Sequence, residues 1–364
     1  MKRGKSVDIL LLAVMVLLLL VGIFMVSSAS WPAGSQGYGD GYHYLKRHLA
    51  FVVLGLFAAL VGYVLPLNFY RKFSLVFWLG SLFLCLLLFS PLARAVNGST
   101  RWIVIPGTEF QFMPADFLKY ASLFFMADLL TGYRKMGQKR GFVPLALVIG
   151  ISAALVAKED FSSAVVIAFG LLSMYFLAGM ALWEFLAMGI GSLLVGGAMV
   201  ALMPYRVKRM TSFQDPFDDL LNTDWQLANS LFAIAMGRMG GVGYFSSTQK
   251  LNNLPEAYND FIFAVIAEEF GFLGVVGILT LYILLVVVGF RVAFRQKETY
   301  NRYLAVGITS SIGIQAFFNM GVASGILPVT GITLPYISYG GTALVLLMAM
   351  SGVLLRLSRE GDYR

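Results

Sequence analysis

The residues best suited to chemistry lie between Leu254 and Gly271, where the longest polar segment of the chain meets an apolar run. Three carboxylates fall within ten residues here: Asp260, Glu268 and Glu269. On a helix, Asp260 and Glu268 would lie roughly 80° apart, and Glu269 would point to the far side. A carboxylate at a membrane border costs free energy unless it is paired or hydrated, so these residues are functional candidates. Asp260 could also serve as the N-cap of the following helix, a role compatible with chemistry.

The composition indicates a membrane protein rather than a soluble one. Of the 364 residues, 59% are hydrophobic and 13% are charged, whereas soluble domains average about 25% charged residues. The net charge of +8 would suit a nucleic-acid-binding protein, but the basic residues lie in short loops between apolar runs, as orientation in a membrane requires. We therefore exclude nucleic acid as a partner. The single cysteine, Cys85, excludes an intrachain disulfide.

Ten apolar runs are each close to the length that crosses a bilayer, about 20 residues. They predict an all-α polytopic membrane protein with about ten transmembrane helices, forming a single membrane domain over residues 1–364. The first run follows a basic N-terminus but is too long for an ordinary signal peptide, so we interpret it as an uncleaved helix. The runs cover residues 9–26, 49–67, 74–91, 115–131, 142–158, 162–180, 184–203, 272–292, 303–324 and 341–356.

The orientation follows from the loops. Most basic residues of the short loops fall on one side of the ten-helix arrangement, and the positive-inside rule makes that side cytoplasmic. Both termini then lie in the cytoplasm. The long loop at about 204–260, between the seventh and eighth helices, is extracytoplasmic and is expected to have partial structure of its own. Asp260 is therefore expected at the outer surface.

Unusual polar residues gather on the same outer side. Arg101 lies in the loop 93–114, and Asp160 lies between the fifth and sixth helices. Asp116 and Lys119 open the fourth helix with a spacing that places them on one helix face. We expect Lys119 to pair with a neighbouring carboxylate and so to fix helix packing.

A basic cluster opens the long loop, at Arg206, Lys208 and Arg209. It has two interpretations of equal weight. The cluster could be a patch whose long side chains reach the lipid headgroups. It could also bind a phosphorylated headgroup, because arginine offers two parallel hydrogen bonds to phosphate oxygens.

The segment Leu327–Gly341 cannot continue a membrane helix, because it contains two prolines and three glycines. It predicts a re-entrant or surface loop that lines a cavity on the same side as Asp260. The glycine-rich turn at 237–243 follows no strand, so it is not a nucleotide-binding phosphate loop. Both histidines, His43 and His48, lie in the first loop, and the sequence carries no metal-ligand or nucleophile motif.

Several ordered motifs resemble the shape, elongation, division and sporulation family of bacterial membrane proteins over nearly the whole chain. The sequences of the segments Thr211–Phe213 and Gln249–Ala257 are more similar to the division member of that family than to the elongation member. The chain departs from the family pattern at Asn259, at Asp116 and at Lys158–Ser163. The matching motifs are Asn97-Gly-x-x-Arg101-Trp102, Pro114-Ala-Asp116-x-x-Lys119, Pro204-Tyr205 with Arg209, Gln249-Lys-Leu-x-x-Leu-Pro255-Glu-Ala, Asp260 to Glu269, and Leu334-Pro-x-x-Ser338-Tyr-Gly-Gly341.

The resemblance implies a peptidoglycan glycosyltransferase that joins lipid II units at the outer face of the bacterial cytoplasmic membrane, in division or elongation. It also implies a class B penicillin-binding protein as partner, with membrane lipids and other division or elongation proteins. A sugar hydroxyl is a poor nucleophile, so Asp260 is expected to be the general base. The leaving diphosphate needs positive charge, from basic side chains or from a divalent cation such as Mg²⁺ or Mn²⁺. The remaining expected roles are substrate binding by Arg101, Arg206, Lys208, Arg209 and Ser338, and shaping of the cavity by Asp116, Lys119, Asp160 and Glu268.

Two other classes of function fit the same set of helices and charged residues. Ten helices with buried charges and a broken segment would also describe a transporter or lipid II flippase, for which Asp128, Glu268 and Glu269 are the interior candidates. A non-catalytic division scaffold would tolerate Asp260→Ala, and an enzyme would not. Transporters place their polar site near the middle of the bilayer, whereas the charges here collect at one face, which favours an enzyme.

Overall fold

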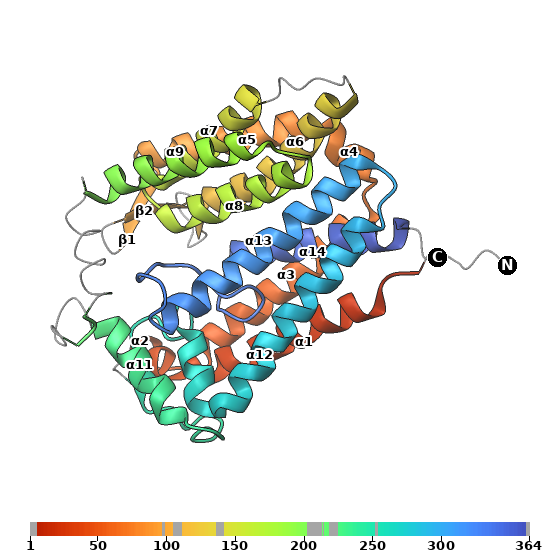
Figure 1. The fold of residues 1–364 in the computed structure, drawn as a ribbon. Helices are drawn as coiled ribbons and strands as arrows, with labels where there is room; N and C mark the ends of the chain where they lie inside the picture. The colour runs from red at the N-terminus through yellow and green to blue at the C-terminus, as the bar shows by residue number, and fades with distance from the viewer. Residues whose placement is uncertain are drawn as a thin grey trace.

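The computed structural model describes residues 6–96, 99–104, 111–135, 142–201, 213, 215–217, 225–251 and 254–361. Helices dominate these residues and run roughly along one direction (Figure 1). The first half of the chain contributes α1 Ile9–Ala29, α2 Trp31–Tyr38, α3 His43–Val64, α4 Leu67–Lys72, α5 Ser74–Leu86 with the 3₁₀ turn Leu87–Phe89, α6 Pro114–Lys135, α7 Phe142–Ala157 and α8 Phe161–Leu177. The second half contributes α9 Leu182–Ala201, α11 Trp225–Gly237, a 3₁₀ turn at Gln249–Leu251, α12 Ile262–Phe294, α13 Thr299–Ala323 and α14 Thr342–Glu360.

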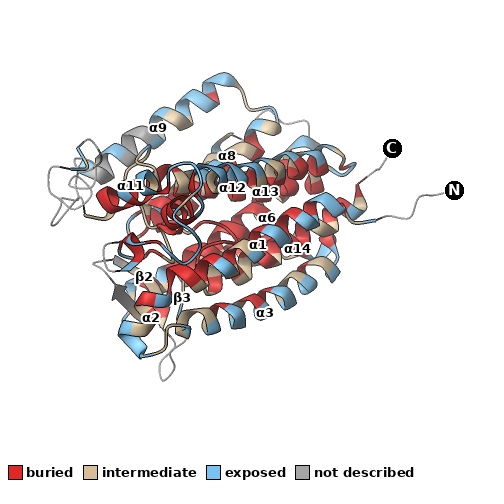
Figure 2. Ribbon diagram, turned by 90° about the horizontal axis from the view of Figure 1, so that it is seen from below, coloured by how far each residue is buried: buried red, intermediate tan, exposed pale blue. Residues whose placement is uncertain are grey.

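Each apolar run predicted from the sequence lies on a helix. In the described residues, α1, α3, α12, α13 and α14 are long and apolar enough to cross a membrane, and α5, α7 and α8 are shorter apolar helices. Large apolar side chains such as Phe57 and Leu60 are exposed on α3, as expected where lipid replaces water. Burial is concentrated on the inward faces, while much of α3 and α9 is exposed (Figure 2). The predicted class, an all-α membrane protein, is confirmed at this level.

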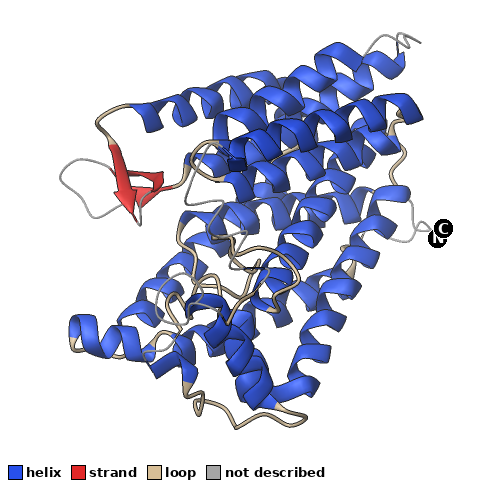
Figure 3. Ribbon diagram, turned by 60° about the vertical axis from the view of Figure 1, so that its left-hand side comes forward, coloured by secondary structure: helices blue, strands red, loops and turns tan. Residues whose placement is uncertain are grey.

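One small β-sheet departs from the all-helical prediction. Strands β1 Ala93–Val96, β2 Ser99–Val104 and β3 Gln111–Phe112 form an antiparallel sheet in that order. Ile103 in the central strand pairs with Ala93 on one side and Phe112 on the other. The sheet projects beyond one end of the helices, opposite the end where α1 begins and α14 finishes (Figure 3). At that other end, Asp8 N donates to Ser358 Oγ at 3.1 Å.

Helix α12 starts at Ile262, well before the predicted run at 272, and it is broken at Gly271 (φ 64°, ψ −160°). Only glycine adopts this backbone conformation readily. The glycine-rich segment 237–243 binds the broken backbone: Val242 N donates to Glu268 O at 2.9 Å, and Phe272 N donates to Arg238 O at 2.8 Å. A Cβ on Gly241 would lie 2.1 Å from Glu269 O, so the close approach requires glycine.

Helices α3 and α14 make a second backbone contact through small residues. A Cβ on Gly352 would lie 1.9 Å from Ala59 O, and a Cβ on Gly62 would lie 2.3 Å from Ala349 O. Small residues allow helices in a membrane to approach this closely. The pair therefore joins the beginning and the end of the chain in one bundle.

Candidate functional site

Asp260 lies in the turn that precedes α12, and two side chains hold this turn by its backbone. Asn319, in α13, donates from Nδ2 to Asp260 O at 2.8 Å and to Ile332 O at 2.6 Å. Ser338 donates from Oγ to Asn259 O at 2.7 Å. The turn and the segment 327–341 are thus fixed against each other, as the predicted loop beside Asp260 requires. The Asp260 side chain itself is partly exposed.

Arg101 and Asp260 meet beside Gly331. A Cβ on Gly331 would lie 2.7 Å from Arg101 Nη1 and 3.2 Å from Asp260 Oδ2. Arg101 is held in place by Glu159, whose carbonyl accepts from Arg101 Nε at 3.0 Å and whose Oε2 accepts from Thr100 N at 3.0 Å. Strand β2, the α7–α8 turn, the 327–341 segment and the Asp260 turn therefore bring one carboxylate and one guanidinium together.

The alternative role of Asp260 as a helix N-cap is not borne out. Helix α12 begins at Ile262, its N-cap residue is Phe261, and no side chain caps it. Asp260 lies one residue too early, because the turn from Pro255 to Phe261 continues up to the helix. Its carboxylate is therefore directed to other partners, among them the neighbourhood of Arg101.

A small cavity lies beside the same segment. Its lining includes Lys119, Tyr120, Gln315, Thr333, Tyr336 and Ser338. Lys119 Nζ donates to Gln315 Oε1 at 2.9 Å and to Asp116 Oδ1 at 3.3 Å. Gln315 Nε2 in turn donates to Thr333 O at 3.0 Å. The Lys119 and Asp116 side chains are only 6% and 9% exposed, so the pair is a buried one that must keep both partners.

Asp160 caps helix α8. Its Oδ1 accepts from Ser163 N at 3.2 Å, and its side chain is buried. Asp160 is not among the residues that line the cavity of Lys119. Its contacts instead fix the turn from which Glu159 holds Arg101.

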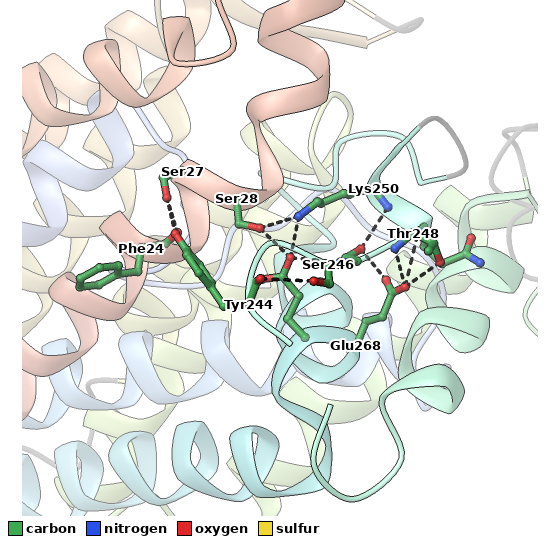
Figure 4. A network of polar contacts seen from close by, with 11 residues as sticks. Phe24, Ser27, Ser28, Tyr244, Ser246, Thr248, Lys250 and Glu268 are labelled. Carbon is green, nitrogen blue, oxygen red and sulfur yellow. Dashed lines mark hydrogen bonds and ion pairs between the residues drawn. The ribbon is translucent and has the colours of Figure 1, made fainter. Parts of the chain in front are cut away.

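The structure gives Glu268 a different place from the one expected. It does not line the cavity; it is fully buried and accepts from Thr248 N at 2.8 Å, Thr248 Oγ1 at 3.0 Å and Ser247 Oγ. Figure 4 shows this network. Because one carboxylate oxygen accepts from a backbone amide and a hydroxyl together, Glu268 is a structural anchor for the 247–249 segment.

Glu269 belongs to the same network. Its Oε1 accepts from Lys250 Nζ at 2.7 Å and from Ser28 Oγ at 2.6 Å (Figure 4). The Lys250 and Glu269 side chains are 2% and 0% exposed. These contacts join α1, the 3₁₀ turn at 249–251 and α12.

The contacts of Ser338 also differ from the expected diphosphate binding. Its hydroxyl accepts from Leu334 N at 2.7 Å and gives its only proton to Asn259 O. Ser338 is buried, although it contributes to the cavity lining. Its contacts make it a residue that positions the Asp260 turn.

Arg206, Lys208 and Arg209 lie outside the described residues, so both interpretations of that basic cluster stay predictions. Within the described ranges, no three His, Cys, Asp or Glu side chains form a group that could hold a metal ion.

Sequence reasoning missed Glu159, Gln315, Asn319 and Gly331. The two amides carried a usable signal: they lie four residues apart on one face of an apolar helix, where polar side chains are costly. Glu159 acts through its backbone carbonyl as well as its carboxylate, and Gly331 acts through the absence of a side chain. Neither property is visible in a sequence.

A sequence profile described as cell cycle protein, the FtsW, RodA and SpoVE family, matches residues 8–363. The probable peptidoglycan glycosyltransferase FtsW of Coxiella burnetii is 38% identical over 356 residues, covering 95% of this chain and 94% of the relative.

Two solved structures have the same fold. A chain from a peptidoglycan synthase complex, described as coordinating polymerization and crosslinking, superposes with a TM-score of 0.81 at 29% identity, covering 97% of this chain and 98% of the other. The rod shape determining protein RodA of Thermus thermophilus gives a TM-score of 0.73 at 25% identity, covering 99% of each chain.

Proposed function

This chain belongs to the FtsW, RodA and SpoVE family of cell cycle proteins, and from this premise we propose that it is a peptidoglycan glycosyltransferase. It would polymerise lipid II into glycan strands at the outer face of the cytoplasmic membrane. The 38% identity to an FtsW relative supports a role in cell division; a role in elongation is the second possibility. The observation that carries the proposal is the meeting of the Asp260 carboxylate and the Arg101 guanidinium beside Gly331.

These two groups suit the two needs of glycosyl transfer to a sugar hydroxyl. The attacking hydroxyl must lose a proton, and Asp260, partly exposed in a backbone turn held by Asn319, is the proposed general base. The departing diphosphate develops negative charge, and Arg101 is the proposed stabilising group. Inversion at the anomeric carbon requires one base only, so a second carboxylate is not needed.

Other charged residues would assist Asp260 and Arg101 without reacting themselves. Arg206, Lys208 and Arg209 would add positive charge toward the diphosphate, and Lys119 with Asp116 would keep the cavity shape without reacting. Mg²⁺ or Mn²⁺ would supply further positive charge at the diphosphate.

The proposed setting has ten transmembrane helices, both termini in the cytoplasm and the Asp260 turn outside. The partly exposed Asp260, the sheet at one end of the helices, and the joined beginning and end of the chain at the other end support it. A class B penicillin-binding protein is the proposed partner for crosslinking, and the match to a chain of a peptidoglycan synthase complex supports it. Lipid II and membrane lipids complete the partners.

The three interior carboxylates that a flippase would use are each bound to another residue. Asp128 pairs with Arg71 at 2.8 Å, Glu268 binds Thr248, and Glu269 binds Lys250. Carboxylates that are each bound in place do not form a path for a charged headgroup. This observation favours an enzyme.

The test is polymerisation of labelled lipid II by the purified protein with its cognate penicillin-binding protein. Asp260→Asn keeps the size of the side chain and removes the base, so strand synthesis should fall about 10²–10⁴-fold while the complex still assembles. Equal synthesis by both proteins would exclude Asp260 as the base. Transport of lipid II across vesicles without synthesis would favour the flippase, and unimpaired division with Asp260→Ala would favour the scaffold.

A further inference from the structure

Five aromatic rings converge outside the Asp260 turn, and we call them the aromatic track: Tyr38, His43, Tyr44, Tyr258 and Tyr339. They come from α2, the start of α3, the Asp260 turn and the 327–341 segment. The ring centroids are 4.6 Å apart for Tyr44 and Tyr258, 5.7 Å for Tyr258 and Tyr339, and 5.9 Å for Tyr38 and Tyr44. His43 stacks flat on Tyr38 at 3.7 Å.

The aromatic track begins at the Asp260 turn. Tyr258 lies two residues before Asp260, and Tyr339 N donates to Tyr258 O at 2.9 Å. Exposure rises away from this turn: Tyr258, Tyr339 and Tyr44 are partly exposed, whereas Tyr38 is 57% exposed. The rings therefore lead from the Asp260 turn to solvent.

Aromatic residues at a membrane surface often form a belt that anchors the protein in the headgroup layer. In a belt, each ring contacts lipid on its own. Here the rings contact one another across segments distant in sequence. A belt does not explain these contacts.

Ionic groups accompany the exposed end of the track. Asp40 Oδ2 accepts from Lys46 Nζ at 2.8 Å, and Asp40 Oδ1 accepts from Tyr42 N at 3.0 Å. The Lys46 hydrogen bond lowers the pKa of Asp40, so this group is a carboxylate. Rings with a neighbouring carboxylate and ammonium match a sugar: C–H groups pack on the electron-rich ring faces, and hydroxyls can bond to the charged groups.

We propose that the aromatic track binds the sugar rings of the glycan strand next to the point of bond formation and holds the strand between successive additions. The proposal rests on the glycosyltransferase function proposed above. The aromatic track itself makes and breaks no covalent bond. Tyr38 contributes an exposed stacking face, and Tyr44 and Tyr258 connect that face to the Asp260 turn.

The test uses the full-length protein in nanodiscs with its penicillin-binding partner. Strand length would be measured from labelled lipid II, and binding would be measured with uncrosslinked glycan fragments that lack the lipid. Tyr38→Ala should weaken fragment binding roughly threefold to tenfold, the loss expected for one ring contact, and should shorten the strands. Tyr38→Trp should retain both properties, because it keeps a stacking face.

Tyr42→Ala is the matched control. Tyr42 is 49% exposed in the short connection between α2 and α3, and within the described part of the chain it pairs with no ring of the track. Its replacement should leave strand length and fragment binding unchanged. Thermal unfolding of each variant would exclude misfolding as the cause.

The outcomes separate the two proposals. A wild-type protein that makes no strands overturns the proposed function. A wild-type protein that makes strands, with Tyr38→Ala giving the same strand length and fragment binding, overturns the aromatic track alone. Equal losses in Tyr38→Ala and Tyr38→Trp would also overturn it, because stacking would then not be the interaction.

Discussion

Asp260 and the pair Glu268 and Glu269 lie within ten residues of one another, yet they have opposite surroundings. Asp260 is partly exposed, and its turn is held by contacts to the backbone. Glu268 and Glu269 are fully buried, and their carboxylates accept from amides, hydroxyls and an ammonium. Glu268 and Glu269 stabilise the fold through bonds to their carboxylates, whereas the Asp260 turn is held through its backbone carbonyls and does not depend on the Asp260 side chain.

The largest expected effect on stability is at Lys250. Lys250→Met leaves Glu269 buried and unpaired, which should lower the free energy of unfolding by about 3–5 kcal/mol. Thermal and denaturant unfolding in detergent would measure this loss. The double variant with Glu269→Gln should recover most of it, because no unpaired charge stays buried.

Lys46→Met is the control for that prediction. The Lys46–Asp40 pair has almost the same length, 2.8 Å against 2.7 Å, but its side chains are 70% and 39% exposed. Water screens exposed pairs, which therefore contribute little to stability, so this change should be barely measurable. Equal losses at Lys46 and Lys250 would refute the importance of burial.

Gly331→Ala tests the other side of the comparison. The added methyl would lie 2.7 Å from Arg101 Nη1, so the guanidinium must move. Misplacement of a catalytic group by about 1 Å can cost on the order of 10²-fold in rate, and we expect strand synthesis to fall by about that factor. The melting temperature should change little, since Arg101 can move toward solvent. Full activity would show that the position of Arg101 is unimportant.

Ser338→Ala should have a smaller effect on stability than Lys250→Met. It removes the hydroxyl that joins Leu334 N to Asn259 O and leaves the buried Leu334 amide without this partner, at a cost of about 1–3 kcal/mol. Synthesis should fall moderately through displacement of the Asp260 turn. The rate of glycan synthesis at varied lipid II concentration would show whether kcat or KM changes. A change confined to KM would instead favour direct substrate binding by Ser338.

The positions of the helices were predictable because each apolar run is long enough to be recognised as a helix from the sequence alone, without its tertiary contacts. Helices α1 and α3 are examples. The predicted apolar run began only at residue 272, because Glu268 and Glu269 look polar in sequence and become tolerable in a buried helix only through Lys250 and Thr248. The candidate site was predictable in part. Asp260 and Arg101 stood out as charges at a membrane border, but their meeting beside Gly331 depends on Glu159 and Asn319, and such tertiary contacts leave no periodic signal.

The backbone contact between α3 and α14 has a consequence for how the protein is made. Helix α3 ends at Val64, and α14 begins only at Thr342. At a synthesis rate of about 5–20 residues per second, α3 enters the membrane well before its partner exists. During that interval the surface around Ala59 and Gly62 must be covered by lipid or by an insertion factor. Truncation before α14 should therefore leave an inserted protein whose first helices remain open to proteolysis and to pairing with other chains.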